Sequence, residues 1–243
     1  MNGLLQDRVA LITGSSRGIG KALAIRFAKE GAHVILVARS RGGLEETDDE
    51  IKKATDNQAK VTLLELDISK FKQVDMLGPT LSERFSCLDI LIGNAGQLGE
   101  LAPLAHIDDK IWANTIDTNL NANWHLIRTT EPLLRLSTAG RALFVTSAAG
   151  QLERPFWGAY AASKAGLEMM VKCWAEEIKN TNVKVNLIDP GKTRTAMRAQ
   201  AYPGENPNDL KEPKMLTDLF VALCDKESSI HGEVIRADEK NNL

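Results

Sequence analysis

A tyrosine and a lysine one helical turn apart carry the clearest chemical signal in this chain. Tyr160 and Lys164 stand at positions i and i+4, so a helix places both on one face. Free tyrosine titrates near pH ~10, and an ammonium about 4 Å from the phenol favours the phenolate by up to roughly 4 kcal/mol at an effective dielectric of about 20. The pair therefore predicts a tyrosine that exchanges protons at neutral pH, with Ser147 upstream as its neighbour.

A glycine-rich turn near the N-terminus is the second signal. Residues 13–20 read Thr-Gly-Ser-Ser-Arg-Gly-Ile-Gly and follow an apolar run of strand length. Gly14 can take a positive φ, Gly18 lets the backbone approach a pyrophosphate, and Gly20 lets a helix pack closely on the strand. The start of that helix offers free N–H groups and the positive end of the helix dipole. The turn therefore predicts a nucleotide site.

The residue at the end of the second expected strand indicates which nucleotide is bound. NAD sites usually carry Asp or Glu at this position, where the carboxylate accepts hydrogen bonds from the ribose 2′-OH. This chain has Arg39 there and Arg17 in the glycine turn itself. Two guanidinium groups suit a 2′-phosphate, so NADP is favoured. The alternative is that both are ordinary surface charges.

Two further segments follow expected strands. Asp67 comes directly after the third strand and could accept a hydrogen bond from the adenine amino group. Alternatively, it is a simple strand-end residue or the N-cap of the next helix. Residues 94–96, Asn-Ala-Gly, follow the fourth strand and offer backbone groups to a cofactor, together with a side-chain amide that can join neighbouring strands. The alternative is an ordinary turn.

Apolar runs of strand length alternate with helical periodicity along the chain. Continuous apolar strands joined through helices predict a parallel sheet covered on both faces. With no internal repeat, low-complexity tract or linker, we predict a single α/β domain over residues 1–243, a Rossmann-type doubly wound parallel sheet. The expected strands are 8–13, 33–39, 61–66, 88–93, 141–147, 183–188 and 233–237. The expected helices are 18–30, 41–55, 71–85, 108–136 (with Asp108 as N-cap), 158–180 and 216–224.

Composition is that of an ordinary globular protein. The chain is 43% hydrophobic and 26% charged, with a formal net charge of −2. It has no basic stripe, so neither nucleic acid nor a membrane surface is an expected partner. The first eight residues lack the apolar core of a signal peptide, and three widely spaced cysteines indicate reduced thiols, so we expect a cytoplasmic protein. Four scattered histidines have no ligand spacing, and no metal site is expected.

Several motifs in one order relate the chain to a known family. They are the glycine turn at 13–20, Asn-Ala-Gly at 94–96, Asn119, Ser147, Tyr-Ala-Ala-Ser-Lys at 160–164 and Pro-Gly at 190–191. Together they make the chain resemble the short-chain dehydrogenase/reductases, in their short single-domain branch, from about Leu4 to Ala237. Within that family, residues 94–99, 157–164 and 190–201 most resemble the YciK-like bacterial oxidoreductases. The resemblance implies a fold and a chemistry but names no substrate.

The resemblance implies a role for each catalytic residue. Tyr160 would give a proton to the carbonyl oxygen during reduction, and Lys164 would lower the pKa of Tyr160 and bind the nicotinamide ribose. Ser147 would hydrogen-bond the substrate oxygen and stabilise the developing charge. Asn119 would hold a water that links Lys164 to solvent. The hydride would come from the cofactor.

The resemblance also implies the cofactor contacts. Pro190, Gly191 and Thr193 would border the nicotinamide, and Thr195 would lie near its carboxamide or a phosphate. The complete set expected to bind NADP is Gly14, Ser16, Arg17, Gly18, Ile19, Gly20, Arg39, Asp67, Ile68, Asn94, Ala95, Gly96, Tyr160, Lys164, Pro190, Gly191, Thr193 and Thr195.

The chain departs from the family pattern near its C-terminus. Many members end in a tail with a Gly-Gly pair that packs in a tetramer interface, and residues 232–243 lack that pair. We therefore favour a homodimer over a homotetramer, formed through the helices around Trp124 and Trp174; the alternative is that these side chains are buried within one chain. The two long helices expected over 108–136 and 158–180 carry more apolar residues than packing on one face of the sheet requires. These include Ile111, Ile127, Met169, Met170 and Trp174.

These features predict an NADP(H)-dependent oxidoreductase that acts on a small carbonyl or secondary alcohol. The alternative is a redox sensor that holds NADP without turnover, which would not need the set of Asn119, Ser147, Tyr160 and Lys164. Epimerases and dehydratases also use Tyr-x-x-x-Lys, but they usually carry an extra substrate domain and a GxxGxxG turn, and neither occurs here. Arg154, Arg194 and Arg198 could face an acidic substrate, although ordinary surface charge is the favoured interpretation.

Overall fold

A computed structural model describes residues 3–238 of the protein. Its seven strands form one sheet in the order β3-β2-β1-β4-β5-β6-β7, and every neighbouring pair is parallel. The strands are β1 (Val9–Thr13), β2 (His33–Ala38), β3 (Val61–Glu65), β4 (Ile90–Gly93), β5 (Arg141–Val145), β6 (Lys184–Asp189) and β7 (Val234–Arg236). The helices are α1 (Gly18–Lys29), α2 (Arg41–Ala54), α3 (Phe71–Asp75), α4 (Leu77–Ser82), α5 (Asp109–Ile116), α6 (Ala122–Leu136), α7 (Gly158–Ile178), α8 (Ala196–Ala201) and α9 (Thr217–Cys224).

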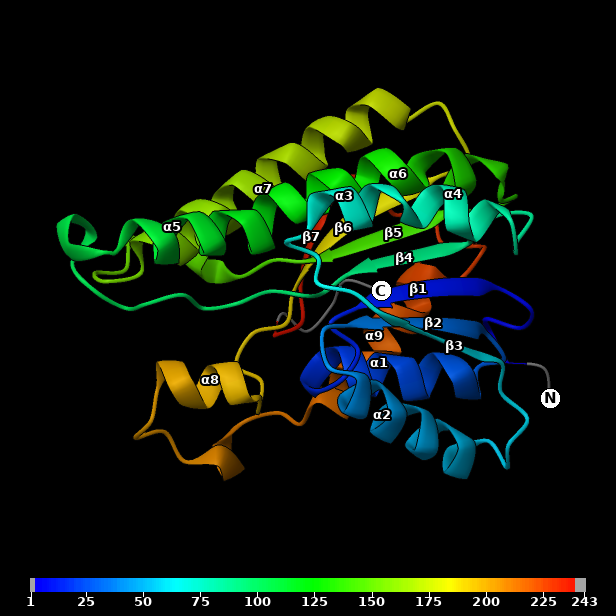
Figure 1. The fold of residues 1–243 in the computed structure, drawn as a ribbon, viewed down its shortest axis with the longest axis horizontal. Coiled ribbons are helices and arrows are strands. Elements are labelled where there is room, and N and C mark those ends of the chain that lie inside the picture. The colour runs from blue at the N-terminus through cyan, green and yellow to red at the C-terminus, as the bar shows by residue number, and fades with distance from the viewer. Residues whose placement is uncertain (1–2, 239–243) are drawn as a thin grey trace.

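The helices form a layer on each face of the sheet. In Figure 1, α1, α2 and α9 lie below the sheet, while α3, α4, α6 and α7 lie above it. The chain runs outward from β1 to β3 and then returns to β4 on the other side of β1, so the sheet is doubly wound. The predicted fold is confirmed. In such sheets a ligand binds at the carboxyl ends of the strands, where the winding direction changes, and here that point lies between β1 and β4.

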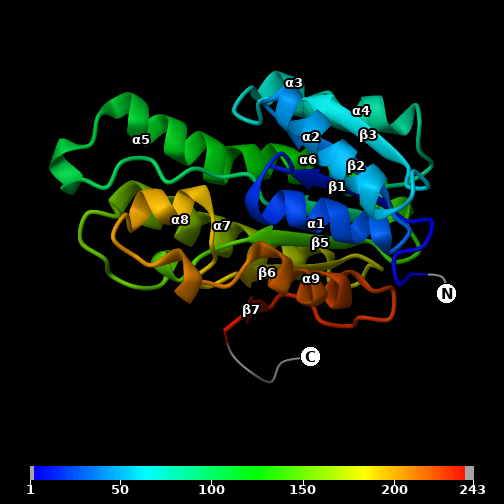
Figure 2. The ribbon, with the colours of Figure 1, turned by 90° about the horizontal axis from the view of Figure 1, so that it is seen from below.

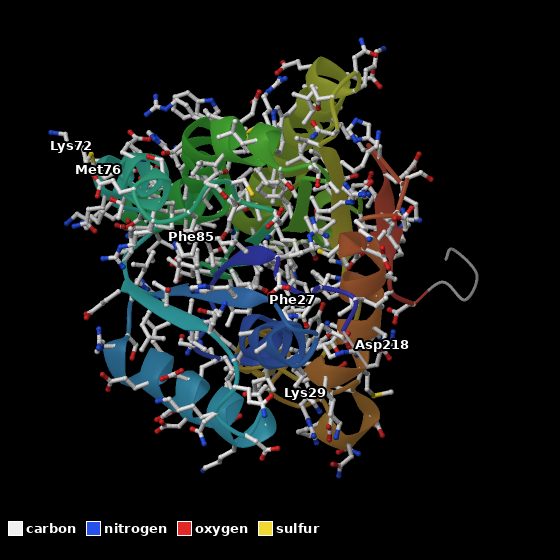
Figure 3. All side chains as sticks on the ribbon, turned by 90° about the vertical axis from the view of Figure 1, so that its right-hand side faces the viewer. Phe27, Lys29, Lys72, Met76, Phe85 and Asp218 are labelled. Carbon is white, nitrogen blue, oxygen red and sulfur yellow. The ribbon has the colours of Figure 1, made fainter. Side chains whose placement is uncertain are left out.

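Two apolar layers hold the sheet to its helices. Side chains such as Phe27 and Phe220 fill the layer under α1, α2 and α9. Leu126 and Leu167 belong to the opposite layer, under α6 and α7. Figure 3 views the side of the molecule that is at the right in Figure 1, and there Phe27 lies between α1 and the sheet while Lys29 lies on the outer side of the same helix. Burial on both faces explains why the strands are continuously apolar rather than alternating.

Two features of the helices differ from the prediction. The single helix expected over 71–85 is two short helices, α3 and α4, because Gly78 packs directly against α6: a Cβ at Gly78 would lie 2.1 Å from the carbonyl oxygen of Thr129. Pro79 follows immediately and has no N–H to continue a helical ladder. The short helix α8 was not predicted, because it lies in a stretch interrupted by proline and glycine.

The long helix expected over 108–136 is one helical run with an irregular centre. Asp108 is its N-cap, as predicted, and accepts hydrogen bonds from the backbone N–H groups of Lys110 and Ile111. Between α5 and α6 the run widens to a π-helical turn, η2 (Asp117–Asn121). Such turns occur often at functional sites, and this one contains Asn119.

The apolar residues expected at an interface fall into two groups. Trp174 and Ile127 are buried within the chain, because Trp174 packs edge-on against Phe144 with ring centroids 6.2 Å apart and donates its Nε1–H to Glu131 at 2.8 Å. The expectation that these two face a partner is wrong. Trp124 and Met169 remain 47% and 62% exposed. None of the helices in residues 3–238 is long and apolar enough to cross a membrane.

Candidate active site

The glycine turn connects β1 to α1 at the carboxyl edge of the sheet. Gly14 has φ of 67°, which suits glycine, and its N–H is bonded to the carbonyl of Val37 in β2 at 2.8 Å. A Cβ at Gly20 would lie 2.3 Å from the carbonyl oxygen of Gly14, so only glycine allows α1 to start this close to the strand. The turn therefore has the shape that the sequence predicts for a phosphate cradle.

A hydrogen-bond network joins β1 to β4 at the same edge. The side-chain amide of Asn94 donates to the carbonyls of Thr13 and Gly14, at 2.9 and 3.3 Å. The Thr13 hydroxyl accepts from the backbone N–H groups of Asn94 and Ala95 and donates to Ile92. The glycine turn is thus fixed to the end of β4 by protein contacts alone.

Arg17 and Arg39 both lie exposed at this edge. Arg17 is the N-cap of α1, and Arg39 comes two residues after Val37, whose carbonyl holds the glycine turn. Within residues 3–238 neither arginine has an ion-pair partner. The start of α2 lies close to the glycine turn, since a Cβ on Gly43 would lie 2.9 Å from the Cβ of Ser16. Two uncompensated cations therefore stand beside the cradle.

Asp67 and Ile68 lie beside the end of β2, because the N–H of Leu66 bonds to the carbonyl of Ala38. Asp67 accepts hydrogen bonds through Oδ1 from both the backbone N–H and the hydroxyl of Ser69, at 3.0 and 2.8 Å. It is not the N-cap of α3, a position that Lys70 occupies. Ile68 is buried.

Tyr160, Lys164 and Ser147 come together where the end of β5 meets the start of α7. Tyr160 and Lys164 lie in the first two turns of α7, both buried, with the Lys164 ammonium 5.8 Å from the centre of the Tyr160 ring. Lys164 Nζ donates to the carbonyl of Val145 at 2.7 Å. Ser147 follows two residues later as the N-cap of η3 (Ala148–Gly150) and is hydrogen-bonded to the Tyr160 phenol.

Burial dominates the electrostatics of this group. It raises the pKa of Tyr160 to about 12, against the hydrogen bond from Ser147, and the carboxylate of Asp189 adds to the rise. Burial also lowers the pKa of Lys164 to about 8, against the attraction of Asp189. Lys164 is not among the groups that shift the pKa of Tyr160, and its ammonium is directed to Val145, so the expected lowering of the Tyr160 pKa by Lys164 stays a prediction.

Asn119 lies in the π-helical turn with its side chain fully buried. Its amide donates to the carbonyl of Gln97 and to the hydroxyl of Ser163, both at 2.9 Å, and its Oδ1 accepts from the Gln97 N–H at 2.8 Å. A Cβ placed on Gly96 would lie 3.2 Å from Asn119 Oδ1 and 3.7 Å from Lys164 Nζ. Gly96, Asn119 and Lys164 therefore border one small space behind Tyr160.

The loop after β6 returns toward the glycine turn. Gly191 has φ of 65° and donates its N–H to Asp189, and Thr193 donates its hydroxyl to the carbonyl of Pro190. Thr195 is the N-cap of α8, and its Cγ2 lies 3.6 Å from the position of a Cβ on Gly18. The two loops thus come close to each other at Gly18 and Thr195.

Sequence reasoning missed several residues of this site. Ser163 donates its hydroxyl to the carbonyl of Tyr160 at 2.7 Å and accepts from Asn119. Asn123 donates to the carbonyl of Asn119 at 2.8 Å. Trp157 stacks edge-on against Tyr160. Ser163 and Trp157 had a signal, because both lie in the segment 157–164 that carries the family resemblance; Asn123 is one turn from Asn119 and carried no motif.

Comparison with known proteins identifies the family. A family model described as short chain dehydrogenase matches residues 8–206. The uncharacterized oxidoreductase YciK of Escherichia coli K12 is 37% identical over 225 residues, which are 93% of this chain and 89% of that protein. The 3-oxoacyl-[acyl-carrier-protein] reductase FabG of Thermotoga maritima is 30% identical over 243 residues, 96% of this chain and 97% of that protein.

Solved structures agree with the sequence relatives. A crystal structure of a short chain dehydrogenase from Escherichia coli CFT073, complexed with NADPH, is 36% identical, covers 98% of this chain and 100% of that chain, and superposes with a TM-score of 0.92. The chain therefore belongs to the short chain dehydrogenase family and is an oxidoreductase. The resemblance inferred from the motifs, including that to the YciK-like branch, is confirmed.

Proposed function

We propose that the protein catalyses hydride transfer between NADP(H) and a small carbonyl or secondary alcohol, with Tyr160 as the acid and base. One observation carries this proposal: the half-buried Ser147 hydrogen-bonds the buried Tyr160, one helical turn before the buried Lys164, at the same edge of the sheet as the glycine turn. A protein that only held NADP would gain nothing from burying a phenol and an ammonium there, since burying a charge is costly.

The residues present fit NADP. The glycine turn leaves room for a pyrophosphate, and the free N–H groups at the start of α1 suit its charge. Arg17 and Arg39 are uncompensated cations within the described residues, as a 2′-phosphate requires. The related structure complexed with NADPH supports the same choice. When bound, the cofactor supplies the hydride.

The protein's own residues account for the proton. With a pKa of about 12, Tyr160 keeps its proton at neutral pH and can donate it to a carbonyl oxygen. Ser147 can donate a second hydrogen bond to that oxygen and stabilise its developing charge. Lys164, with a pKa of about 8, is mostly protonated at pH 7 and compensates the phenolate left behind. Lys164 has two N–H groups without a protein partner among the described residues, and through them it could pass a proton back to Tyr160.

Turnover with a panel of carbonyl compounds tests the proposed reaction. Ketones, aldehydes and 3-oxoacyl thioesters are each mixed with protein and NADPH, and the absorbance of NADPH is followed. The thioesters are included because a relative is a 3-oxoacyl-[acyl-carrier-protein] reductase. At least one class should be reduced at a rate proportional to protein. Tight NADPH binding with no turnover in any class would favour the redox sensor.

Cofactor preference is tested by equilibrium titration. NADPH should bind more tightly than NADH by about 30-fold, the factor expected from roughly 2 kcal/mol of charge-assisted hydrogen bonding. Arg39→Asp should remove most of this preference. Arg41→Asp is the matched control, because Arg41 is equally exposed but already pairs with Glu45 at 2.7 Å. Equal affinities for NADPH and NADH in the unchanged protein would contradict the assignment of NADP.

Assembly and location complete the proposal. The exposed side chains of Trp124 and Met169 lie on α6 and α7, and they support a homodimer through these helices, with a tetramer less favoured. The cysteines at 87, 173 and 224 are all free thiols, which supports a cytoplasmic location. Light scattering after size exclusion tests the dimer: a mass of 26.6 kDa would mean that the chain is a monomer.

A further inference from the structure

Two aromatic side chains, Trp157 and Tyr202, form a wall beside Tyr160. Trp157 contacts Tyr160 edge-on, with ring centroids 5.8 Å apart, and Tyr202 contacts Trp157 at 5.7 Å. Leu98 and Met197 pack in the same small apolar cluster. Trp157 comes from the turn before α7, and Tyr202 follows α8 directly. A substrate that presents its carbonyl to Tyr160 therefore meets a flat apolar surface.

The arginines near this wall have different charge partners. Arg194 is paired with Glu212 at 2.5 Å. Arg198 binds Glu205 through two hydrogen bonds of 2.6 Å and lies 3.7 Å above the ring of Tyr202. Both guanidinium groups are compensated by a carboxylate, so neither needs an anion from a substrate.

Arg154 differs from both. It is half-buried, and within residues 3–238 it has no carboxylate partner. Its Nη1 donates to the hydroxyl of Tyr202 at 2.7 Å, and its guanidinium carbon lies 5.7 Å from the centre of the Trp157 ring. A guanidinium has five N–H donors in a planar fork, so most of them remain available. The two aromatic residues thus hold a cation in place without neutralising it.

The backbone that carries Arg154 and Trp157 is under strain. The N–H of Trp157 bonds to the carbonyl of Arg154 at 3.3 Å, which closes a four-residue turn with Pro155 second. Phe156, the third residue, has φ of 73°, a conformation that such turns usually assign to glycine. A bulky residue in this region persists only where its surroundings impose it, often at a binding site. The turn fixes the positions of Arg154 and Trp157 relative to each other.

We propose that Arg154 selects substrates that carry a carboxylate remote from the reacting carbonyl, with a flat apolar body between the two lying against Trp157. The inference rests on the proposed function, because it assigns a substrate class to the same site. The order of groups follows the order of contacts, since Trp157 contacts both Tyr160 and Arg154. A guanidinium binds a carboxylate through two parallel hydrogen bonds, which adds direction as well as affinity.

Matched acid and ester ketones test the inference. The acids are 4-acetylbenzoate and 3-(4-acetylphenyl)propionate, which differ in reach, and each is compared with its methyl ester in NADPH-dependent reduction. At least one acid should exceed its ester in kcat/KM by ten-fold or more, as expected for hydrogen bonds to a charged group. Arg154→Met should bring this ratio close to one, through KM, and Arg154→Lys should restore part of it. Arg194→Met, which removes a guanidinium already paired with Glu212, should keep the ratio of the unchanged protein.

Binding is measured in addition to turnover, so that failure of the proposed reaction can be distinguished from failure of the proposed carboxylate recognition by Arg154. Quenching of tryptophan fluorescence reports the affinity of each acid and ester for the protein with NADPH, whether or not reduction follows. Binding that prefers the acid and depends on Arg154, without reduction, would contradict the proposed reaction and support anion recognition. Equal affinity and equal kcat/KM for both acid–ester pairs would overturn the inference. A preference for the acid that stays unchanged in both Arg154→Met and Arg154→Gln would also overturn the inference. The Gln variant is included in case the Met variant misfolds.

Discussion

The two edges of the sheet both bury cations, but they use them differently. At the amino edge, Arg8 and Arg141 are buried, and at the carboxyl edge Lys164 is buried. The comparison matters because a buried charge is usually taken as a sign of function. Burial alone does not distinguish the structural cations from the functional one. The number of hydrogen bonds that each cation makes to the protein does distinguish them.

The amino-edge arginines are saturated by backbone carbonyls. Arg141 donates to the carbonyls of Gly140, Asp225, Lys226 and Ser228, and Arg8 donates to those of Asp89, Ala139 and Cys224. Two of these carbonyls, on Cys224 and Asp225, lie at the C-terminal end of α9, where a cation also suits the helix dipole. In Figure 2 this end of α9 lies beside the sheet. The two arginines fasten the last helix to the sheet and have few donors left for a ligand.

The carboxyl-edge lysine is not saturated. Lys164 makes one hydrogen bond, to Val145, and within the described residues its other two N–H groups have no protein partner. Burial lowers its pKa, and Tyr160 beside it has its pKa raised. A buried cation with spare donors beside a buried acid is arranged for chemistry rather than for stability. The difference yields predictions for each edge.

The largest effect is expected from Tyr160→Phe. Removing the phenol should lower turnover by at least about 100-fold, the usual scale of positioned acid–base catalysis, because the proposed mechanism assigns the proton transfer to Tyr160 alone. NADPH affinity and thermal stability should stay close to those of the unchanged protein. Steady-state kinetics and NADPH titration on the purified variant measure both. Turnover within a few-fold of the unchanged protein would remove Tyr160 from the mechanism.

The opposite pattern is expected from Arg141→Met at the amino edge. The change removes four hydrogen bonds and leaves the carbonyls of Lys226 and Ser228 without another donor among the described residues, whereas those of Gly140 and Asp225 keep a backbone N–H. Each buried unpaired group costs about 1–3 kcal/mol before relaxation. We expect the free energy of unfolding to fall by roughly 4 kcal/mol, while kcat and KM of the folded protein change little. Urea denaturation followed by circular dichroism, together with kinetics below the transition, tests this. A loss of turnover in fully folded protein would show that the two edges are not separate in role.

The Lys164→Met variant tests the comparison through the pH dependence of its stability. The pKa of Lys164 is lowered from 10.5 to about 8, so the unfolded chain binds more protons between these values and stability rises with pH there. Below about pH 8 the folded protein bears the full cost of the buried charge. The Met variant lacks this cost, so its stability relative to the unchanged protein should decline by up to roughly 3 kcal/mol as pH rises from 8 toward 10.5.

Denaturation of both proteins at pH 7, 8, 9 and 10 measures this difference. A constant difference in stability across the series would mean that the Lys164 amine is not desolvated as the structure indicates. Turnover of the Met variant should be lost at every pH, in contrast to Arg141→Met.

The smallest effect concerns backbone strain at the two edges. Apart from glycine, the described residues with positive φ are Asp7, Asp56, Asn57 and Phe156. Asp and Asn tolerate this conformation and stand near the amino edge, whereas Phe156 stands beside the site. Phe156→Gly should stabilise the fold by up to about 1 kcal/mol, and Asn57→Gly, the matched control, by much less. Thermal melts decide between them; a destabilised Phe156→Gly would mean that the ring contributes more than its 58% exposure suggests.

Most elements were predictable because their signals are local. The strands of the structure lie within two residues of the expected ranges, and Asp108 caps its helix as expected. The break between α3 and α4 was not predictable in position, because it depends on Gly78 meeting Thr129 of α6. The π-helical turn at Asn119 was missed for the same kind of reason: its side chain is held by Gln97 and Ser163, which are distant in sequence.

The sequence by itself determined the fold class, the glycine turn and the positions of Tyr160 and Lys164, because periodicity, backbone conformation and i, i+4 spacing are properties of neighbouring residues. Only the tertiary structure decided which cations are structural, which are compensated and which are free. Arg8 and Arg141 resemble surface charges in the sequence, and Arg154 resembles Arg194 and Arg198. The state of a charge depends on burial and on partners from remote segments, such as Cys224 for Arg8 and Tyr202 for Arg154, and folding alone brings these together.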